Sequence, residues 1–294
     1  MRTLLASALS LLFLIAAPAH ADPGVTREET HVGLDAATVW YPANAGRRLP
    51  VALMLPGANM RREYYSRFAS AVADYGFVVV IPERYPMPGY SLPSEQSITD
   101  VVGWARERAA DPGSRIGSVV DPETLVVAGH SYGGAAALYA AADRCQVPFC
   151  FGVSYRHPPQ LKAIVGHGTN TTIGPVVDVV AVQGIPVLYI NGTEDSVSEP
   201  AEAHESFTKL TGAPTAAFVN LLGANHFGLA DEDNPPGAAP DAHPGTAPRE
   251  QTIAAAARWT AQWFLAQLGD SEARAFVYGG GTRTDAVVSV EMPS

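Results

Sequence analysis

A serine flanked by two glycines carries the clearest chemical signal in this sequence, in Gly129-His130-Ser131-Tyr132-Gly133. Gly129 and Gly133 stand two residues before and after Ser131, where a sharp strand-to-helix turn needs small side chains because its strained backbone brings those positions together. An apolar β-type segment, residues 124–128, precedes the motif, and a run of good helix formers, residues 135–142, follows it. Such a turn lifts the serine hydroxyl above the sheet. The motif therefore predicts a nucleophile, and the alternative is a glycine-rich turn whose serine only caps a helix.

Asp195 and His226, which come much later in the chain, could together activate Ser131. A serine hydroxyl is a weak nucleophile unless a base accepts its proton, and the base needs a carboxylate that orients it. Asp195 and His226 each follow a later apolar segment, in Asn191-Gly192-Thr193-Glu194-Asp195 and Gly223-Ala224-Asn225-His226-Phe227. Loops after parallel strands meet at one edge of a sheet, so both side chains would lie near the serine. The order Ser131, Asp195, His226 is that of α/β-hydrolases and not that of trypsin-like or subtilisin-like proteases.

Other residues could fill these roles. Glu194 is an alternative acid to Asp195, because it is the preceding residue in the same loop. His167, in Val165-Gly166-His167-Gly168, is an alternative base to His226, although it would precede the acid in the chain. His130 is adjacent to the serine but should point away from it, so we interpret it as a packing residue.

The negative charge that develops during acyl transfer needs two N–H donors already in place, each worth roughly 3 kcal/mol of barrier. Tyr132, directly after the serine, supplies one backbone N–H. The second is expected from Pro56-Gly57-Ala58-Asn59, where Gly57 allows a close approach and the Ala58 N–H is the predicted donor. The alternative for this segment is an ordinary strand-to-helix turn.

The elements that would position these residues alternate between strands and helices. Apolar or alternating segments predict strands at 29–34, 37–41, 51–55, 77–81, 124–128, 161–165, 185–190 and 216–221. Helical spacing predicts helices at 63–73, 97–109, 201–210 and 248–269, besides the helix after the serine. The strands are nearly all apolar, which indicates an α/β fold with a mostly parallel central sheet and helices on both faces. Residues 233–248 contain five prolines and predict a stiff loop.

The two ends of the sequence predict an export signal and a C-terminal tail. Met1-Arg2, the apolar run 4–17 and Ala19-His20-Ala21 are typical of a cleavable secretory signal, so we expect residues 1–21 to be removed on export to a periplasm or to the medium. The alternative is an uncleaved membrane anchor, but the run is short for a bilayer span and no other stretch could form one. Residues 22–275 would form the catalytic domain and residues 276–294 a tail that either adds an edge strand or stays loose.

Charge and cysteine content exclude several classes of partner. The net charge of −10 argues against nucleic acid or an anionic membrane surface as the main partner. Cys145 and Cys150 most simply form a local disulfide in an exported protein, and two buried thiols are the alternative. Two cysteines make a poor metal site, and Asp231-Glu232-Asp233 is either a solvated face or a cation site. We expect neither a metal nor a cofactor.

Several stretches together resemble the α/β-hydrolase superfamily, and within it the PET-hydrolase or cutinase-like (polyester hydrolase) group and chlorophyllase-like esterases. The resemblance covers most of residues 37–229 and rests on Leu55-Pro56-Gly57, Tyr75-Gly76-Phe77-Val78-Val79-Val80, the glycine–serine motif and residues 223–227. It implies Ser131 as nucleophile, His226 as base, Asp195 as acid, and Ala58 and Tyr132 as backbone oxyanion donors. Polyester hydrolases usually carry an aromatic residue and methionine at these last two positions. Chlorophyllases usually carry arginine at the position of Tyr132 and histidine at that of Pro56.

The sequence therefore predicts an exported serine hydrolase that cleaves carboxylic esters, small or polymeric, through an acyl-enzyme. One alternative is a catalytically silent module of the same fold that binds a hydrophobic ligand, and another is a peptidase, for whose specificity domain the chain leaves no room. Aromatic residues that could line the rim of the substrate cleft, or pack beneath it, are Tyr64, Tyr65, Tyr85, Tyr90, Tyr132 and Phe227.

Overall fold

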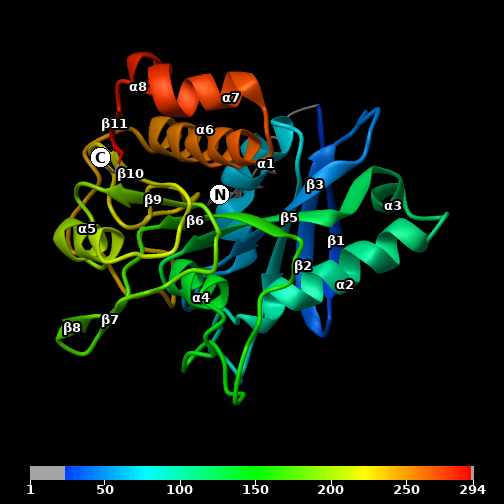
Figure 1. Ribbon diagram of the computed structural model, residues 1–294, viewed down its shortest axis with the longest axis horizontal. Helices are drawn as coiled ribbons and strands as arrows, with labels where there is room; N and C mark the ends of the chain where they lie inside the picture. The colour runs from blue at the N-terminus through cyan, green and yellow to red at the C-terminus, as the bar shows by residue number, and fades with distance from the viewer. Residues whose placement is uncertain (1–23, 293–294) are drawn as a thin grey trace, which may run out of the picture.

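A nine-stranded sheet runs through the protein in the order β1-β2-β4-β3-β5-β6-β9-β10-β11 (Figure 1). This computed structural model describes residues 24–292. The strands of the sheet are β1 (Val25–Val32), β2 (Asp35–Pro42), β3 (Leu49–Leu55), β4 (Val78–Glu83), β5 (Val120–His130), β6 (Leu161–His167), β9 (Val187–Gly192), β10 (Ala216–Leu221) and β11 (Val288–Glu291). Neighbouring strands from β4 to β10 are parallel, whereas β1–β2, β2–β4 and β10–β11 are antiparallel pairs. The predicted mostly parallel sheet is confirmed.

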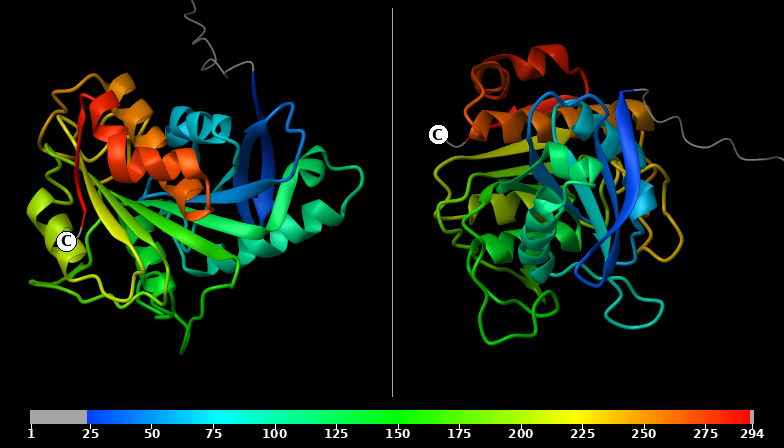
Figure 2. Two further views of the ribbon diagram at one scale, coloured as in Figure 1. Left: turned by 45° about the horizontal axis from the view of Figure 1, so that its top comes forward. Right: turned by 90° about the vertical axis from the view of Figure 1, so that its right-hand side faces the viewer.

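Helices cover both faces of the sheet, as Figures 1 and 2 show. On one face α1 (Ser66–Asp74), preceded by a 3₁₀ turn (Arg62–Tyr65), packs beside α6 (Arg249–Gln267), and Phe68 of α1 and Phe264 of α6 belong to the same core cluster. On the other face lie α2 (Gln96–Ala110), α4 (Tyr132–Ala141) and α5 (Pro200–Thr208). The short helices are α3 (Arg115–Val119), α7 (Ser271–Ala275), a π-helical turn (Phe276–Gly280) and α8 (Gly281–Thr284). The fold is that of the α/β-hydrolases.

The central strands end in register at one edge of the sheet. Gly129 of β5 pairs with Leu55 of β3 on one side and with Gly166 of β6 on the other. Farther along the same edge, Gly192 ends β9 beside Leu221 at the end of β10. The segments that follow these five parallel strands therefore emerge side by side, and they carry every residue predicted to do chemistry.

The structure departs from the expected elements mainly at their ends. The strand expected at 124–128 begins four residues earlier, at Val120, and the one expected at 29–34 ends at Val32 because Gly33 turns the chain with φ of +57°. Residues 276–284 are helical, and β11 adds an antiparallel edge strand beyond β10. The predicted export signal lies outside the described residues. Between residues 24 and 292 there is no helix long and apolar enough to cross a bilayer.

Candidate active site

Ser131 occupies a strained turn between β5 and α4. Its φ of +52° and ψ of −122° lie outside the regions that ordinary residues adopt, a cost of about 1–3 kcal/mol that the surrounding structure must supply. A Cβ on Gly129 would lie 2.3 Å from the carbonyl of Gly133, and one on Gly133 would lie 2.1 Å from the carbonyl oxygen of Leu55. Only glycine fits at these two positions, so the sequence motif is a direct consequence of the turn.

Asp195 and His226 are in direct contact. The two carboxylate oxygens of Asp195 lie 3.1 and 2.9 Å from Nδ1 of His226, and the side chains are 0% and 4% exposed. Oδ1 of Asp195 also accepts from the backbone N–H groups of Val197 and Ser198, at 2.9 and 2.7 Å. Because a carboxylate only accepts, Nδ1 of His226 carries the proton and Nε2 is left as the free, basic nitrogen.

The backbone after β6 lies between the Asp195–His226 pair and the turn that carries Ser131. The carbonyl of His167 accepts from the Ser131 N–H at 2.8 Å. A Cβ on the next residue, Gly168, would lie 3.1 Å from both Asp195 Oδ2 and His226 Nδ1. Among the contacts of residues 24–292 there is no hydrogen bond from the Ser131 hydroxyl to His226. The structure thus joins acid and base directly and holds the serine beside them through residues 167–168.

The loop after β3 leaves one backbone donor unused. Gly57 donates its N–H to the Tyr65 hydroxyl at 3.0 Å, and Asn59 donates to the carbonyl of Ser91 at 2.9 Å. The Ala58 N–H between them has no acceptor within the described part of the chain. A backbone donor without a partner next to a nucleophile is what an oxyanion site requires.

The second expected donor is the N–H of Tyr132, the first residue of α4. The first N–H groups of a helix have no acceptor inside it, so this one points out at the helix end. A Cβ added to Gly57 would lie 3.3 Å from the Cβ of Ser131, which places the loop that carries Ala58 directly against the serine. The segments that carry the two predicted donors therefore lie next to Ser131.

His130 is completely buried and takes part in a chain of hydrogen bonds. The Tyr65 hydroxyl lies 2.9 Å from Nδ1 of His130, whose Nε2 lies 2.9 Å from the carbonyl oxygen of His226. The two imidazole rings are 4.6 Å apart. Burial and the neighbouring His226 ring hold the pKa of His130 well below its usual value, so the ring is uncharged. These hydrogen bonds give His130 more than the packing role predicted from the sequence.

Asp241, in the proline-rich loop, was not among the predicted site residues. Its carboxylate accepts from the backbone N–H of His226 at 2.7 Å, from the N–H of His243 at 2.8 Å, and from both the N–H and the hydroxyl of Ser196. Burial would raise the pKa of Asp241, but these hydrogen bonds outweigh it and lower the pKa. Asp241 thus ties the loop of the acid to that of the base. The one sequence signal was that it is the single acidic residue in 234–248.

The alternative acid and base have other surroundings. His167 is buried, its Nε2 lies 2.9 Å from the Thr260 hydroxyl, and its ring meets Phe68 edge-on. Burial lowers the pKa of His167 to about 3, and its ring makes no hydrogen bond to a carboxylate in the described structure. Glu194 donates its backbone N–H to the carbonyl of Ala224, and in the described structure its side chain makes no hydrogen bond to His226.

The acidic run at 231–233 is not simply a solvated face. Asp231 accepts from the backbone N–H groups of Ser66 and Arg67 at the start of α1 and from the Arg67 guanidinium. Asp233 accepts from the side-chain amide of Asn225 at 2.8 Å. Both carboxylates hold neighbouring segments together, because the loop that contains them folds back over α1.

A cavity of about 410 Å³ opens beside Ser131. Four segments form its walls: the start of α4, residues 146–149, residues 168–173, and residues 197–202, which lead into the first turn of α5. Tyr132 and Phe149 form an apolar side, with ring centroids 5.4 Å apart. The volume is in the range of small-molecule sites.

Most of the aromatic residues considered for the rim lie elsewhere. Tyr132 lines the cavity and is 46% exposed. Tyr64, Tyr65 and Phe227 are buried, because the 3₁₀ turn before α1 and the turn after β10 direct them into the core beneath the site. Their alternative interpretation as packing residues holds.

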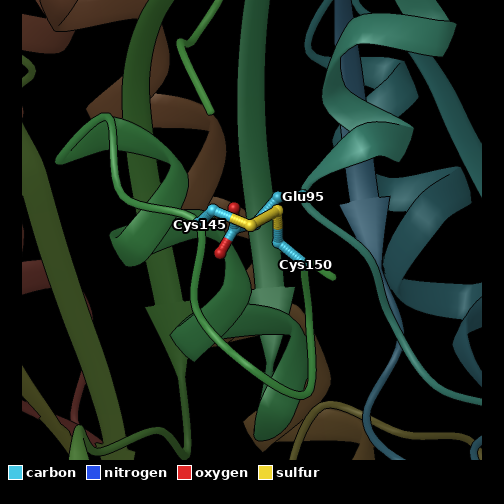
Figure 3. Close-up of side chains that lie close together, drawn as sticks. All are labelled: Glu95, Cys145 and Cys150. Carbon is cyan, nitrogen blue, oxygen red and sulfur yellow. A yellow bond between two sulfur atoms is a disulfide. The ribbon is translucent and has the colours of Figure 1, made fainter. Parts of the chain in front are cut away.

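A disulfide between Cys145 and Cys150 closes the loop that forms one cavity wall. Figure 3 shows the Glu95 side chain beside it. Potential ligand atoms of these three residues lie within 4.8 Å of one another. The sulfur atoms are bonded to each other and are not free thiolates, so this group offers a metal ion only the carboxylate.

Glu95 holds the disulfide loop in place. Its carboxylate accepts from the Gln146 N–H at 3.1 Å, and its own N–H donates to the carbonyl of Phe149 at 3.2 Å. The second carboxylate oxygen is buried without a hydrogen-bond partner in the described structure. Burial raises the pKa of Glu95 to about 7, against the opposing effects of the Gln146 hydrogen bond and the Arg144 charge.

Comparison with known proteins finds a likeness over part of the chain. A family model described as Chlorophyllase matches residues 25–153, which include the Ala58 loop and the Ser131 turn but neither Asp195 nor His226. "Chlorophyllase type 0" of Chenopodium album is 34% identical over 98 residues, or 31% of this chain. The match spans only 28% of that relative's length. The chain is thus an α/β-hydrolase in fold, and from residue 25 to residue 153 it resembles the chlorophyllases, a family of esterases with this fold.

Proposed function

We propose that this protein is a serine hydrolase that cleaves carboxylic esters through an acyl-enzyme. The observation that carries the proposal is the buried Asp195–His226 pair, held beside the strained turn that presents Ser131. The resemblance to chlorophyllases supports an esterase-type activity. A binding module would have no need of an acid–base pair, two unused N–H donors and a strained serine at one sheet edge.

The arrangement suits acyl transfer in two steps. His226 accepts the Ser131 proton at Nε2 as the hydroxyl oxygen attacks the ester carbonyl, and Asp195 stabilises the imidazolium that forms. The N–H groups of Ala58 and Tyr132 stabilise the negative oxygen of the tetrahedral intermediate. His226 then returns the proton to the leaving alcohol, and water attacks the acyl-enzyme by the same route.

The size and lining of the cavity favour esters with a bulky, partly apolar group. A space of about 410 Å³ beside Tyr132 and Phe149 holds more than an acetyl group. A screen of esters of graded chain length, with a chlorophyll and a polyester film among the substrates, identifies the preferred class.

Replacement of Ser131 by alanine tests the mechanism. S131A should lose at least about a thousandfold of kcat/KM on p-nitrophenyl butyrate, because the nucleophile is gone while the fold remains. A fluorophosphonate probe should label the wild type and not S131A. The control is S118A, which removes an exposed hydroxyl on α3 whose only partner among residues 24–292 is the Arg115 carbonyl. Unchanged turnover in S131A would show that Ser131 is not the nucleophile. A wild type that neither hydrolyses the ester nor reacts with the probe would leave ligand binding as the better hypothesis.

We also propose that the protein is exported and loses residues 1–21. The support is the pattern of a basic start, an apolar run and a small-residue end in those residues. N-terminal sequencing of protein recovered outside the cytoplasm should begin at Asp22, and a retained N-terminus would refute the cleavage.

A further inference from the structure

The cavity beside Ser131 contains a single charge. Of the described residues that line it, Glu202 alone has an ionisable side chain that is charged at neutral pH; the others are apolar, aromatic, amide or hydroxyl residues. Glu202 lies in the first turn of α5, across the cavity from the disulfide loop. Any ester group that fills this space meets one negative charge and no positive charge from the lining.

The Glu202 carboxylate is not neutralised by a basic residue. Its Oε2 accepts from the side-chain amide of Asn170 at 3.1 Å, and Asn170 also lines the cavity. In the described structure no lysine, arginine or histidine forms an ion pair with it. Lys209, the residue after α5, is bound to Glu205 at 2.6 Å, and both line a hollow that adjoins Glu202. Glu202 is half-buried, so water screens its field less than that of an exposed carboxylate.

The consequence is selection by charge. An acyl or alcohol group that ends in a carboxylate would be repelled by Glu202, whereas an uncharged group is tolerated and a cationic or hydroxyl-bearing group gains an acceptor. We propose that Glu202 is a specificity residue that makes this cavity prefer esters whose bound group is neutral or cationic over esters with a second, free carboxylate. The proposal rests on the proposed esterase function and names its substrate class.

The test compares esters that differ only in terminal charge. One series carries the charge on the acyl side: p-nitrophenyl esters of hexanoate, of 6-(trimethylammonio)hexanoate and of adipate as its half-ester. A second series carries it on the alcohol side: hexyl acetate, 6-acetoxyhexyl-trimethylammonium and 6-acetoxyhexanoate, followed by base uptake at constant pH. The full-length protein is measured as wild type, E202Q and E107Q. Glu107 is exposed on α2, its side chain makes no hydrogen bond or ion pair in the described structure and it does not line this cavity, so E107Q controls for the change in net charge.

In the wild type, kcat/KM for the cation should exceed that for the anion by roughly tenfold in at least one series. In E202Q this ratio should fall at least threefold, and in E107Q it should stay at the wild-type value. A wild-type ratio near one in both series, or the same ratio in E202Q as in the wild type, would overturn the proposal. If the wild type does not hydrolyse even the neutral esters, the proposed esterase function itself fails, and the selection fails with it.

Discussion

Replacement of Gly168 by alanine probes the contact between acid and base without removing either. Gly168 follows β6 with φ of +49°, and its added Cβ would lie 3.1 Å from Asp195 Oδ2, 3.1 Å from His226 Nδ1 and 3.4 Å from His226 Cε1. These distances are shorter than ordinary contacts with a methyl group, so the carboxylate or the imidazole must shift by a few tenths of an ångström. The shift acts on the hydrogen bond that keeps the proton on Nδ1.

Two effects of the substitution can be separated. The left-handed φ costs a non-glycine residue about 1–2 kcal/mol, which lowers the free energy of unfolding but has no direct effect on the reaction. Displacement of the base by a fraction of an ångström costs on the order of tenfold to a hundredfold in rate, because acyl transfer depends on the position of Nε2 relative to the hydroxyl. This corresponds to about 1.4–2.7 kcal/mol of barrier.

The chain offers a matched control in Gly174. Its φ of +60° imposes the same backbone strain, and an added Cβ meets nothing within 4 Å. Gly174 lies in the turn between β7 (Thr172–Ile173) and β8 (Val176–Val177), outside the lining of the Ser131 cavity. Both variants should melt a few degrees below the wild type, but only G168A should lose kcat/KM on p-nitrophenyl butyrate. A folded G168A with kcat/KM within twofold of the wild type would refute the assignment of Asp195 and His226 as a working pair.

Two further substitutions test the residues around the site. D241N places an amide NH₂ where the carboxylate now accepts N–H and O–H groups. It should therefore lower the free energy of unfolding by about 2–3 kcal/mol, measured by chemical denaturation, and kcat by roughly tenfold, measured by steady-state kinetics. An unchanged kcat would show that Asp241 does not position His226. E95Q removes a buried carboxyl group whose pKa is raised from its ordinary value of 4.5 to about 7 in the folded protein. The unfolded chain loses this proton first, so the contribution of Glu95 to wild-type stability is largest below pH 4.5 and falls by about 3 kcal/mol as the pH rises to 7. E95Q, which does not titrate, should therefore gain stability over the wild type across this range in melts at pH 4.5, 6 and 8, and a constant difference would contradict the raised pKa.

Local patterns were enough to predict the mostly parallel sheet and the meeting of Asp195 and His226 at one of its edges. Apolar runs at β3, β5, β9 and β10 mark strands buried on both faces, and the residue types after each run mark the reactive edge. The turn at Ser131 could be recognised because its backbone excludes a Cβ at Gly129 and Gly133, which leaves a trace in the sequence. Strand ends were less predictable, since β5 extends back to Val120 through residues without an apolar pattern.

Contacts made by irregular segments left no such trace. Asp241 acts through backbone N–H groups of residues 15 and 45 positions away, and no periodicity links them. Tyr65 belongs to a helical pattern whose first turn is 3₁₀, which directs the ring under the oxyanion loop and not toward the rim. The charge of the cavity depends on which face of α5 turns inward, and the spacing of that helix alone does not specify it.

A buried series of hydrogen bonds runs from Gly57 through Tyr65 and His130 to His226. It explains why a histidine, His130, can stand directly before the proposed nucleophile. The Gly57 N–H can only donate and the His226 carbonyl can only accept, so Tyr65 must donate to Nδ1 of His130 and His130 must donate from Nε2. One neutral tautomer satisfies every group, and a second proton on Nδ1 would displace the Tyr65 hydrogen. In the proposed mechanism an uncharged ring 4.6 Å from His226 favours the reaction, because His226 becomes positive as it accepts the serine proton and a second cation beside it would oppose that step. The same hydrogen bonds fix the Gly57 loop, so the proposed oxyanion donor, Ala58, and the proposed base, His226, are held by one set of hydrogen bonds.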